Sequence, residues 1–427
     1  MRFAYGAPTA WFYTLLQLSQ FHLPYYASRT LPNTFALIPA VIAHACFLPA
    51  PGWSRAAQRN HLKLGIYLLA IAAVVFRSEL ALLLAFQALD LLMTRRLTMS
   101  QIFIAGLAGG VVGLLATVAV DSYFWLSFTD KPIFTTPALT ERFGLLWPEL
   151  SAFHFNALMG SASQWGDSPW HYYFSSALPK LLLNPACLVL LPLGTVTLPH
   201  AARTLLLPAL SFVATYSAAV KHKEWRFIVY VVPQLTLLSA LAAAWLWNRR
   251  AKYVAIRVLL LAVMASIPAS LLASAGMLGV SSYNYPGGEA MERIHALVSA
   301  NTTTETKVHL DVLTCMTGAT RFLQESPLYP TTPKRTSHII WDKTEDETAL
   351  LTPDFWADID YALVAKKEKT IGLYEVLDVV RGFGGVRVFK PSDEEGGDGW
   401  RLRRYLGGWW VGVKMRDWLW IVQRQEL

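Results

Sequence analysis

Charged residues are scarce in this chain of 427 residues, at 15%, whereas hydrophobic residues make up 54% and the mean hydropathy is +0.35. So little charge excludes an ordinary soluble domain. Cysteine is scarce too: Cys46, Cys187 and Cys315 have no metal-ligand spacing, and we interpret them as packing residues. Histidine, aspartate and glutamate form no cluster with ligand spacing, which predicts no tightly bound metal.

Internal repeats and a cleavable signal peptide are also missing from the sequence as it stands. The net charge of +8 is not arranged as a basic stripe interleaved with base-stacking aromatic residues, which excludes nucleic acid as a partner. The basic residues gather instead in short loops between apolar segments. The positive charge is therefore mostly a matter of membrane topology.

Long apolar segments are what the chain has in abundance, and they predict a multi-pass α-helical membrane protein. Segments close to the roughly 20 residues of a spanning helix lie near 33–50, 100–120, 176–197, 204–220, 227–247 and 255–277. Segment 63–93 differs, because Arg77 and Glu79 interrupt its apolar run. We expect a hairpin of two short helices there, since such a break is tolerated only inside protein or beside a watery cavity.

Basic residues in short loops give the orientation. The basic loops at 51–63, 94–99, 198–203 and 248–257 contain no acid, so they are expected on the cytosolic side. The alternation of spans then places residues 28–33, 77–79, 121–175 and 221–226 together on the opposite face. These four polar stretches are therefore expected to meet on the non-cytosolic side.

Residues 221–230 (KHKEWRFIVY) concentrate charge between two apolar segments. Ionisable groups at such a place are costly, so they indicate a function. His222, Lys223 and Arg226 suit an anionic group that arrives at the membrane face, and a lipid phosphate is the obvious candidate. The alternative is that these residues simply extend their charged ends from a helix terminus into water.

The composition changes after about residue 280, where long apolar runs stop and polar residues increase. Alternating patterns predict strands at 308–312 and 359–364, and helices are expected at 288–299 and 316–324. We therefore divide the chain into a polytopic membrane domain, 1–280, and a small α/β domain, 281–427. The topology places the second domain on the non-cytosolic side.

Four stretches resemble a known family. They are 28–33 (SRTLPN), 76–80 (FRSEL), 121–125 (DSYFW) with 147–149 (WPE), and 222–227 (HKEWRF). Together they resemble glycosyltransferase family 22, the mannosyltransferases of the endoplasmic reticulum that use dolichyl-phosphate mannose as donor. Residues 20–23, 156–169, 317–323 and 341–345 are most similar to the branch that adds the eighth mannose, in α-1,6 linkage, to the lipid-linked oligosaccharide of protein N-glycosylation.

The resemblance implies a GT-C type membrane protein with a C-terminal luminal α/β domain, an inverting transfer, and no cofactor or nucleotide. The lipid-linked oligosaccharide would be the acceptor, and dolichyl-phosphate mannose and membrane lipid the other partners. Family members begin with a helix and a luminal loop whose acidic residue is thought to act as base. This sequence starts after that loop, so we expect an N-terminally truncated chain whose base is absent and whose own activity is open.

The resemblance and the local charges together suggest roles for individual residues. His222, Lys223 and Arg226 would bind the donor phosphate, whereas Glu224 would pair with these cations, and Arg29 and Arg77 would support the cluster. Glu79 and Asp121 are candidates for the base or for sugar contacts.

Each of these assignments has a structural alternative. Glu79 could pair with Arg77 or Arg29, and Asp121 could cap the segment that follows it. Trp165, Trp170 and Tyr173 could form a substrate platform or only an interfacial aromatic belt.

Three other functions fit parts of the sequence. A glycosylphosphatidylinositol (GPI)-anchor mannosyltransferase would share the HKEWRF stretch and differ in its acceptor. A non-catalytic fragment that binds donor lipid would need no base. A transporter would explain intramembrane charges, but the missing repeat and the polar tail argue against it.

Overall fold

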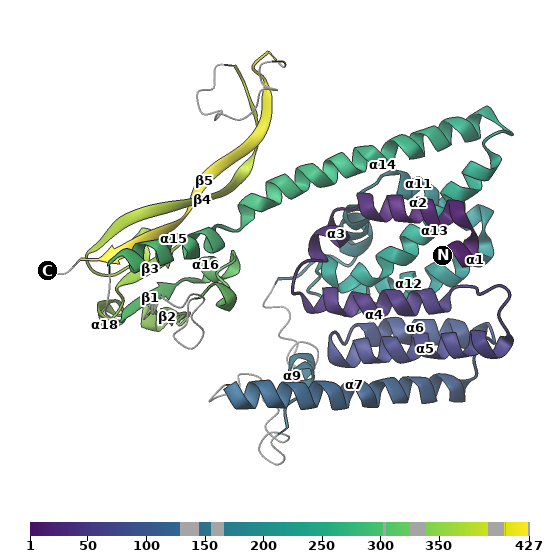
Figure 1. Cartoon of the computed structure of the whole chain (residues 1–427), viewed down its shortest axis with the longest axis horizontal. Coiled ribbons are helices and arrows are strands. Elements are labelled where there is room, and N and C mark those ends of the chain that lie inside the picture. The colour runs from purple at the N-terminus through teal and green to yellow at the C-terminus, as the bar shows by residue number, and fades with distance from the viewer. Residues whose placement is uncertain are drawn as a thin grey trace. The chain divides into compact units, whose positions relative to one another are not determined.

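The computed structural model describes residues 1–128, 145–154, 166–301, 305–324, 339–391, 405 and 407–425 (Figure 1). Within these residues the chain forms two compact units, Met1–Ala275 and Gly276–Leu427. The first unit is helical and the second combines helices with a β-sheet. Each unit is described by itself.

Unit 1 is built from apolar helices joined by short connections. Its elements are α1 (Arg2–Tyr5), α2 (Ala7–Ser19), α3 (His22–Tyr26), α4 (Pro32–Phe47), α5 (Arg55–Val75), α6 (Leu80–Met93), α7 (Met99–Phe128), α9 (Pro148–Phe153), η3 (Tyr173–Ala177), α10 (Leu178–Leu182), α11 (Ala186–Thr197), α12 (Pro199–Ala219), η4 (Trp225–Val231), α13 (Val232–Arg249) and α14 (Val254–Ser281), which continues into unit 2. Proline stands in the first turn of α2, α4, α9, α10, α12 and α13, where its missing N–H costs nothing.

Three helical segments of the described chain are long and apolar enough to cross a membrane: Met99–Trp125, Trp225–Arg249 and Val254–Asn284. They agree with three of the six segments expected from the sequence. The expected span at 176–197 is a pair of helices bent by 105°. The one at 33–50 is the shorter helix α4, of 16 residues, and the one at 204–220 belongs to α12, which is not among the candidate spans.

The hairpin expected at 63–93 is present, with its break between Val75 and Leu80. Its first arm is not short, however, because α5 begins at Arg55 and has 21 residues. Ser54 caps this helix by accepting a hydrogen bond from the N–H of Ala57 at 3.2 Å. Most of the loop predicted at 51–63 is therefore helical, and that prediction was wrong.

Helix α7 lies along α5 (Figure 1), where glycine allows a close approach. A Cβ atom at Gly109 would lie 2.4 Å from the carbonyl oxygen of Tyr67, so only glycine fits without a shift of the backbone. In contrast, α13 is the buried centre of the unit. In the candidate span that contains α13, 94% of the most apolar 18-residue stretch is buried inside the protein, whereas the corresponding share for α7 is 22%. The core of unit 1 therefore gathers around α13, and α7 offers most of its surface to the surroundings.

Unit 2 contains a five-stranded sheet in its described part, in the order β2-β1-β3-β5-β4. Strands β1 (Thr306–Leu310), β2 (Ile339–Asp342) and β3 (Tyr361–Val364) are parallel, and β4 (Tyr374–Phe389) and β5 (Trp410–Arg424) form a long antiparallel pair. Buried residues of α15 (Pro286–Asn301), including Met291 and Ile294, share a core with β1, β3 and β5.

The predicted strands at 308–312 and 359–364 correspond to β1 and β3, and the predicted helix at 288–299 corresponds to α15. The helix expected at 316–324 is wrong. Helix α16 (Val312–Met316) ends there, because Gly318 takes a φ of +113°, and a single 3-10 turn (Arg321–Leu323) follows. The pair β4–β5 was not predicted.

Candidate functional site

Three of the polar stretches meet where helices of unit 1 begin or break. Asn33, near the start of α4, donates its Nδ2 hydrogens to Glu79 Oε1 at 3.1 Å and to the Tyr230 hydroxyl at 2.9 Å. The same nitrogen lies 3.2 Å from the carbonyl oxygen of Arg226. Tyr230 also donates to Glu79 Oε1, at 3.3 Å. The stretches 28–33, 76–80 and 222–227 are therefore one structural cluster.

Glu79 anchors Arg77 in this cluster. The Arg77 Nε donates to Glu79 Oε1 at 3.0 Å, so that one carboxylate oxygen receives three of the described hydrogen bonds. The Glu79 side chain is only 7% exposed, against 27% for Arg77. Glu79 thus pairs with Arg77, as one structural alternative proposed, and it is held at the inner side of the cluster.

Two guanidinium groups lie on one aromatic ring. The Arg77 Cζ is 5.3 Å and the Arg226 Cζ 5.8 Å from the centroid of the Phe227 ring. Such cation–π contacts hold a charged group in place without consuming its hydrogen-bond donors. Phe227 therefore contacts both arginines, which lie in separate stretches of the sequence.

Glu224 pairs with its neighbours. His222 Nε2 lies 3.0 Å from Glu224 Oε1, and the Arg226 Nη2 donates to the same oxygen at 2.7 Å. Although burial favours a higher pKa for Glu224, these two contacts hold the pKa below its usual value. The carboxylate is thus ionised and engaged, as expected of a residue that pairs with cations.

The Lys223 side chain is engaged by backbone carbonyl oxygens. The residue is buried, and its ammonium group donates to the carbonyl oxygens of Val220, Ser168 and Lys221 at 2.7, 3.1 and 3.4 Å. Burial lowers the pKa of this amine, and the charge of Asp167 opposes the shift. Three carbonyl oxygens use all three ammonium hydrogens, so Lys223 in this geometry ties the chain at 168 to the turn at 220–221.

The backbone of η4 depends on α4 a second time. His44 Nε2 lies 3.1 Å from the carbonyl oxygen of Tyr230. In a 3-10 turn this carbonyl would accept from residue 233, which is a proline without an N–H. His44 therefore satisfies a carbonyl that the local sequence leaves without its usual donor, and α4 holds η4 at both Asn33 and His44.

Asp121 lies inside α7, so the alternative that it caps the following segment was wrong. Its Oδ2 accepts a hydrogen bond from Thr117 at 2.7 Å, and the same hydroxyl lies 3.4 Å from Glu149 Oε2. Burial, with a smaller contribution from Asp121, raises the pKa of Glu149. These two carboxylates form a pair of their own, and the described hydrogen bonds and ion pairs do not join them to Glu79.

The remaining predicted residues are spread out. Arg29 is exposed and lies over the Tyr25 ring, 4.8 Å from its centroid. Trp165 lies outside the described residues. Trp170 is 71% exposed, whereas Tyr173 is fully buried and packs beside Tyr216. Tyr173 is therefore a core residue, and its assignment to a substrate platform was wrong.

Asn33 and Tyr230 are central to the cluster, although neither was predicted as a site residue. Both belong to the quoted stretches, Asn33 to SRTLPN and Tyr230 to the charged decapeptide. The sequence did contain a signal for both residues. An amide and a phenol stand beside ionisable residues within apolar stretches, where polar groups need partners.

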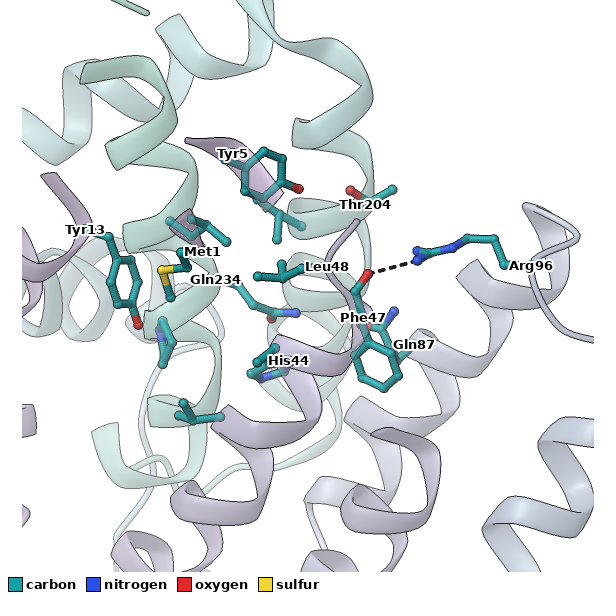
Figure 2. Close-up of a pocket in the computed structure, with 15 residues that line it drawn as sticks. Met1, Tyr5, Tyr13, His44, Phe47, Leu48, Gln87, Arg96, Thr204 and Gln234 are labelled. Carbon is teal, nitrogen blue, oxygen red and sulfur yellow. Dashed lines mark hydrogen bonds between the residues drawn. The ribbon is translucent and has the colours of Figure 1, made fainter. Parts of the chain in front are cut away.

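Unit 1 also contains a cavity whose lining includes His44, which contacts the Tyr230 carbonyl. Figure 2 shows its lining, with His44, Gln87 and Gln234 around it and Arg96 donating to the carbonyl oxygen of Phe47 at 3.0 Å. No residue predicted for the site is among those that line it. Within the described part of the chain, no group of three or more histidine, cysteine, aspartate or glutamate residues could hold a metal ion.

Fold and site together define a helical protein with apolar candidate membrane spans and an ionic cluster where its helices break. Residues 1–322 match the model of the Alg9-like mannosyltransferase family. The chain belongs to this family, and its helical unit is consistent with a GT-C membrane protein.

Individual curated proteins also match this chain. The probable Dol-P-Man:Man(7)GlcNAc(2)-PP-Dol alpha-1,6-mannosyltransferase of Schizosaccharomyces pombe is 34% identical over 378 residues, which cover 88% of this chain and 61% of that protein. The Dol-P-Man:Man(7)GlcNAc(2)-PP-Dol alpha-1,6-mannosyltransferase of Drosophila melanogaster is 34% identical over 86% of this chain and 47% of its own length. The GPI alpha-1,2-mannosyltransferase 3 of Xenopus laevis is 26% identical over 52% of this chain and 37% of its own. No solved structure matches.

The chain thus spans about half to three fifths of the length of these two alpha-1,6-mannosyltransferases.

Proposed function

We propose that the protein transfers mannose from dolichyl-phosphate mannose, in α-1,6 linkage, to the lipid-linked oligosaccharide used for protein N-glycosylation. The names of the relatives that match most of the chain support this acceptor, and the match to a GPI mannosyltransferase is weaker and shorter. The carrying observation is the ionic cluster, in which three stretches of the family match come together.

The proposed location is the membrane of the endoplasmic reticulum, with the cluster and the C-terminal domain, 281–427, on the luminal side. Basic residues in the connections at 94–99 and 248–257 support this orientation by the positive-inside rule. The donor lipid and the lipid-linked acceptor would then reach the cluster from the luminal leaflet.

The reaction is inversion at the anomeric carbon of mannose. An acceptor hydroxyl attacks that carbon, the bond to the phosphate oxygen breaks, and dolichyl phosphate leaves with the electron pair. Cations beside the leaving phosphate stabilise the charge that it gains, and a carboxylate accepts the proton of the hydroxyl. Among the predicted phosphate ligands, Arg226 still has an unused terminal nitrogen, Nη1, in the described structure. We therefore keep Arg226 as a phosphate ligand, and we propose that His222, whose Nε2 lies 3.0 Å from Glu224 Oε1, positions Glu224 beside it.

Two other residues receive revised roles. We propose that Lys223 braces the 220–224 turn, because its ammonium hydrogens all face carbonyl oxygens. We also propose that Glu79 orients Arg77 rather than acting as the base, because its Oε1 already receives three hydrogen bonds. Asp121 stays a candidate for sugar contacts, and Trp170 stays a candidate platform residue. We add Glu149 to the candidates for sugar contacts, because its Oε2 lies 3.4 Å from the Thr117 hydroxyl that donates to Asp121.

An assay with full-length protein in microsomes tests this function. Radiolabelled dolichyl-phosphate mannose and a lipid-linked oligosaccharide with seven mannoses are the substrates, and glycans are released and sized. We expect one added mannose that an α-1,6-specific mannosidase removes, and Arg226→Ala should reduce its formation by at least about 100-fold. Labelling of a GPI precursor in place of the oligosaccharide would instead support the GPI-anchor alternative.

A further inference from the structure

We infer that Arg77 is the second phosphate-binding cation of the cluster and that it, with Arg226, contacts the donor phosphate in the place first assigned to Lys223. This inference rests on the proposed function. The cationic side chains near 222–227 differ in how many hydrogen-bond donors they still have to offer.

Lys223 and His222 have little to offer a ligand. The three ammonium hydrogens of Lys223 face three carbonyl oxygens. Both ring nitrogens of His222 lie 3.0 Å from an oxygen, Nδ1 from the Gly166 carbonyl and Nε2 from the Glu224 carboxylate. A phosphate at either residue would have to displace contacts that are already made, and for Lys223 also expose a buried amine.

Arg77 is in the opposite situation. Its Nε is bonded to Glu79, while neither terminal nitrogen has a hydrogen bond among the described contacts, and 27% of the side chain is exposed. A guanidinium group bound through Nε keeps its two terminal nitrogens for a planar, bidentate contact with two oxygens. The two non-bridging oxygens of a phosphodiester are the matching acceptor pair.

The position of Arg77 is fixed from several sides. Glu79 holds its Nε, and Asn33 and Tyr230 hold Glu79. Phe227 supports the guanidinium group and also the one of Arg226. A cation held in this way loses little side-chain entropy when phosphate binds, which favours affinity. Asn33, Tyr230 and Glu79 are therefore positioning residues that act through Arg77.

Binding of dolichyl phosphate, the leaving product, tests the inference directly. Full-length protein in phosphatidylcholine vesicles is titrated with dolichyl phosphate, and the dissociation constant is compared with the KM for dolichyl-phosphate mannose. We expect Arg77→Gln to raise both by about 10- to 100-fold, as for the loss of a charge-assisted contact. Arg77→Lys keeps the charge without the fork and should recover only part of the loss.

A matched control is Arg381→Gln, because Arg381 also pairs with a carboxylate through its Nε, at 3.2 Å from Asp417, but lies in unit 2. It should leave both constants unchanged. Lys223→Met should lower the unfolding temperature and leave the dissociation constant within about twofold. If Arg77→Gln reduces folding through the unpaired carboxylate, the double variant with Glu79→Gln removes that carboxylate and gives the same readout.

Equal affinity of Arg77→Gln and the unaltered protein for dolichyl phosphate would overturn the inference, whether or not mannose is transferred. A protein that binds dolichyl phosphate through Arg77 but transfers no mannose would refute the proposed function and leave the inference standing. Loss of affinity in Lys223→Met at an unchanged unfolding temperature would return the role to Lys223.

Discussion

Asn33→Asp is the sharpest test of the cluster, because it exchanges a donor for an acceptor at one buried atom. Asn33 is 3% exposed, and its Nδ2 lies 3.1 Å from Glu79 Oε1. The substitution puts a carboxylate oxygen where that nitrogen stood. Two carboxylates then face each other at hydrogen-bond distance in a site that is nearly closed to water.

The size of the effect follows from this distance. Two unit charges 3.1 Å apart repel by about 5 kcal/mol at an effective dielectric constant of about 20. The pair can avoid this cost by sharing one proton, which at pH 7 costs a carboxyl group roughly 4 kcal/mol, since its ordinary pKa is about 4. The variant therefore takes up a proton on folding, and the charge pair adds at most roughly 4 kcal/mol to the cost of the hydrogen bonds that Asn33 loses.

This uptake gives the variant a pH dependence of definite sign. The shared proton raises the pKa of the pair in the folded state, so stability is regained as the pH falls and lost as it rises. The deficit relative to the unaltered protein should shrink by about 1.4 kcal/mol for each pH unit between 7 and 5. Over the two pH units this amounts to about 2.8 kcal/mol, which corresponds to a recovery of about 5 °C in the apparent unfolding temperature.

The assay is thermal unfolding of the full-length protein in detergent, at pH 7, 6 and 5. Asn33→Leu is the comparison, because it removes the same hydrogen bonds without adding a charge, and its deficit should not change with pH. If the two variants lose the same stability at every pH, Asn33 and Glu79 are not in contact and the proposed cluster is wrong.

Two further substitutions probe other parts of the molecule. Gly109→Ala places a Cβ 2.4 Å from the Tyr67 carbonyl oxygen, whereas the Cβ of the control Gly110→Ala meets nothing within 4 Å. Both variants gain the same helix propensity, so Gly109→Ala should be less stable than Gly110→Ala by about 1–3 kcal/mol in thermal unfolding. Equal stabilities would contradict the packing of α7 on α5. Burial favours a higher pKa for Asp342, but the contact with His309 at 2.7 Å helps to hold this pKa below its ordinary value of 3.8. The ionised carboxylate therefore stabilises the fold when the pH is above 3.8, and this contribution is lost as the pH falls through the pKa of the folded state. Asp342→Asn should therefore lose less in unfolding temperature than the unaltered protein when the pH is lowered from 7 to 3, and equal losses would contradict the role of this pair.

The break between α5 and α6 could be predicted because Arg77 and Glu79 stand in an otherwise apolar run. Such residues are so costly in a membrane helix that their position alone marks an irregular segment. The approach of residues 28–33, 77–79 and 221–226 was predicted from the alternation of spans. Its details did not, because a hydrogen bond such as that of Asn33 depends on helix rotation, which hydropathy does not determine.

The direction of individual side chains was the main feature that the sequence could not predict. Lys223 and Arg226 look equivalent in the charged decapeptide, but the turn at 220–224 directs the first toward backbone carbonyls and the second toward Phe227. Tyr173 is of a residue type that is common at membrane interfaces, and yet it is a buried core residue. The strands β4 and β5 were missed because charged residues and glycines interrupt their alternation, and three register irregularities allow such a pair to form.

The length of α4 has a consequence for the bilayer around the protein. At 1.5 Å per residue its 16 residues extend about 24 Å, and the 14 residues of α6 about 21 Å, whereas a typical hydrocarbon core is about 30 Å thick. In the proposed membrane location, a hydrophobic mismatch of this size would thin the adjacent bilayer or tilt the neighbouring helices. Both helices begin at the cluster, so a thinner membrane would bring the headgroup layer toward Asn33 and Glu79. A lipid phosphate could then reach Arg226 with its chain still in its own leaflet.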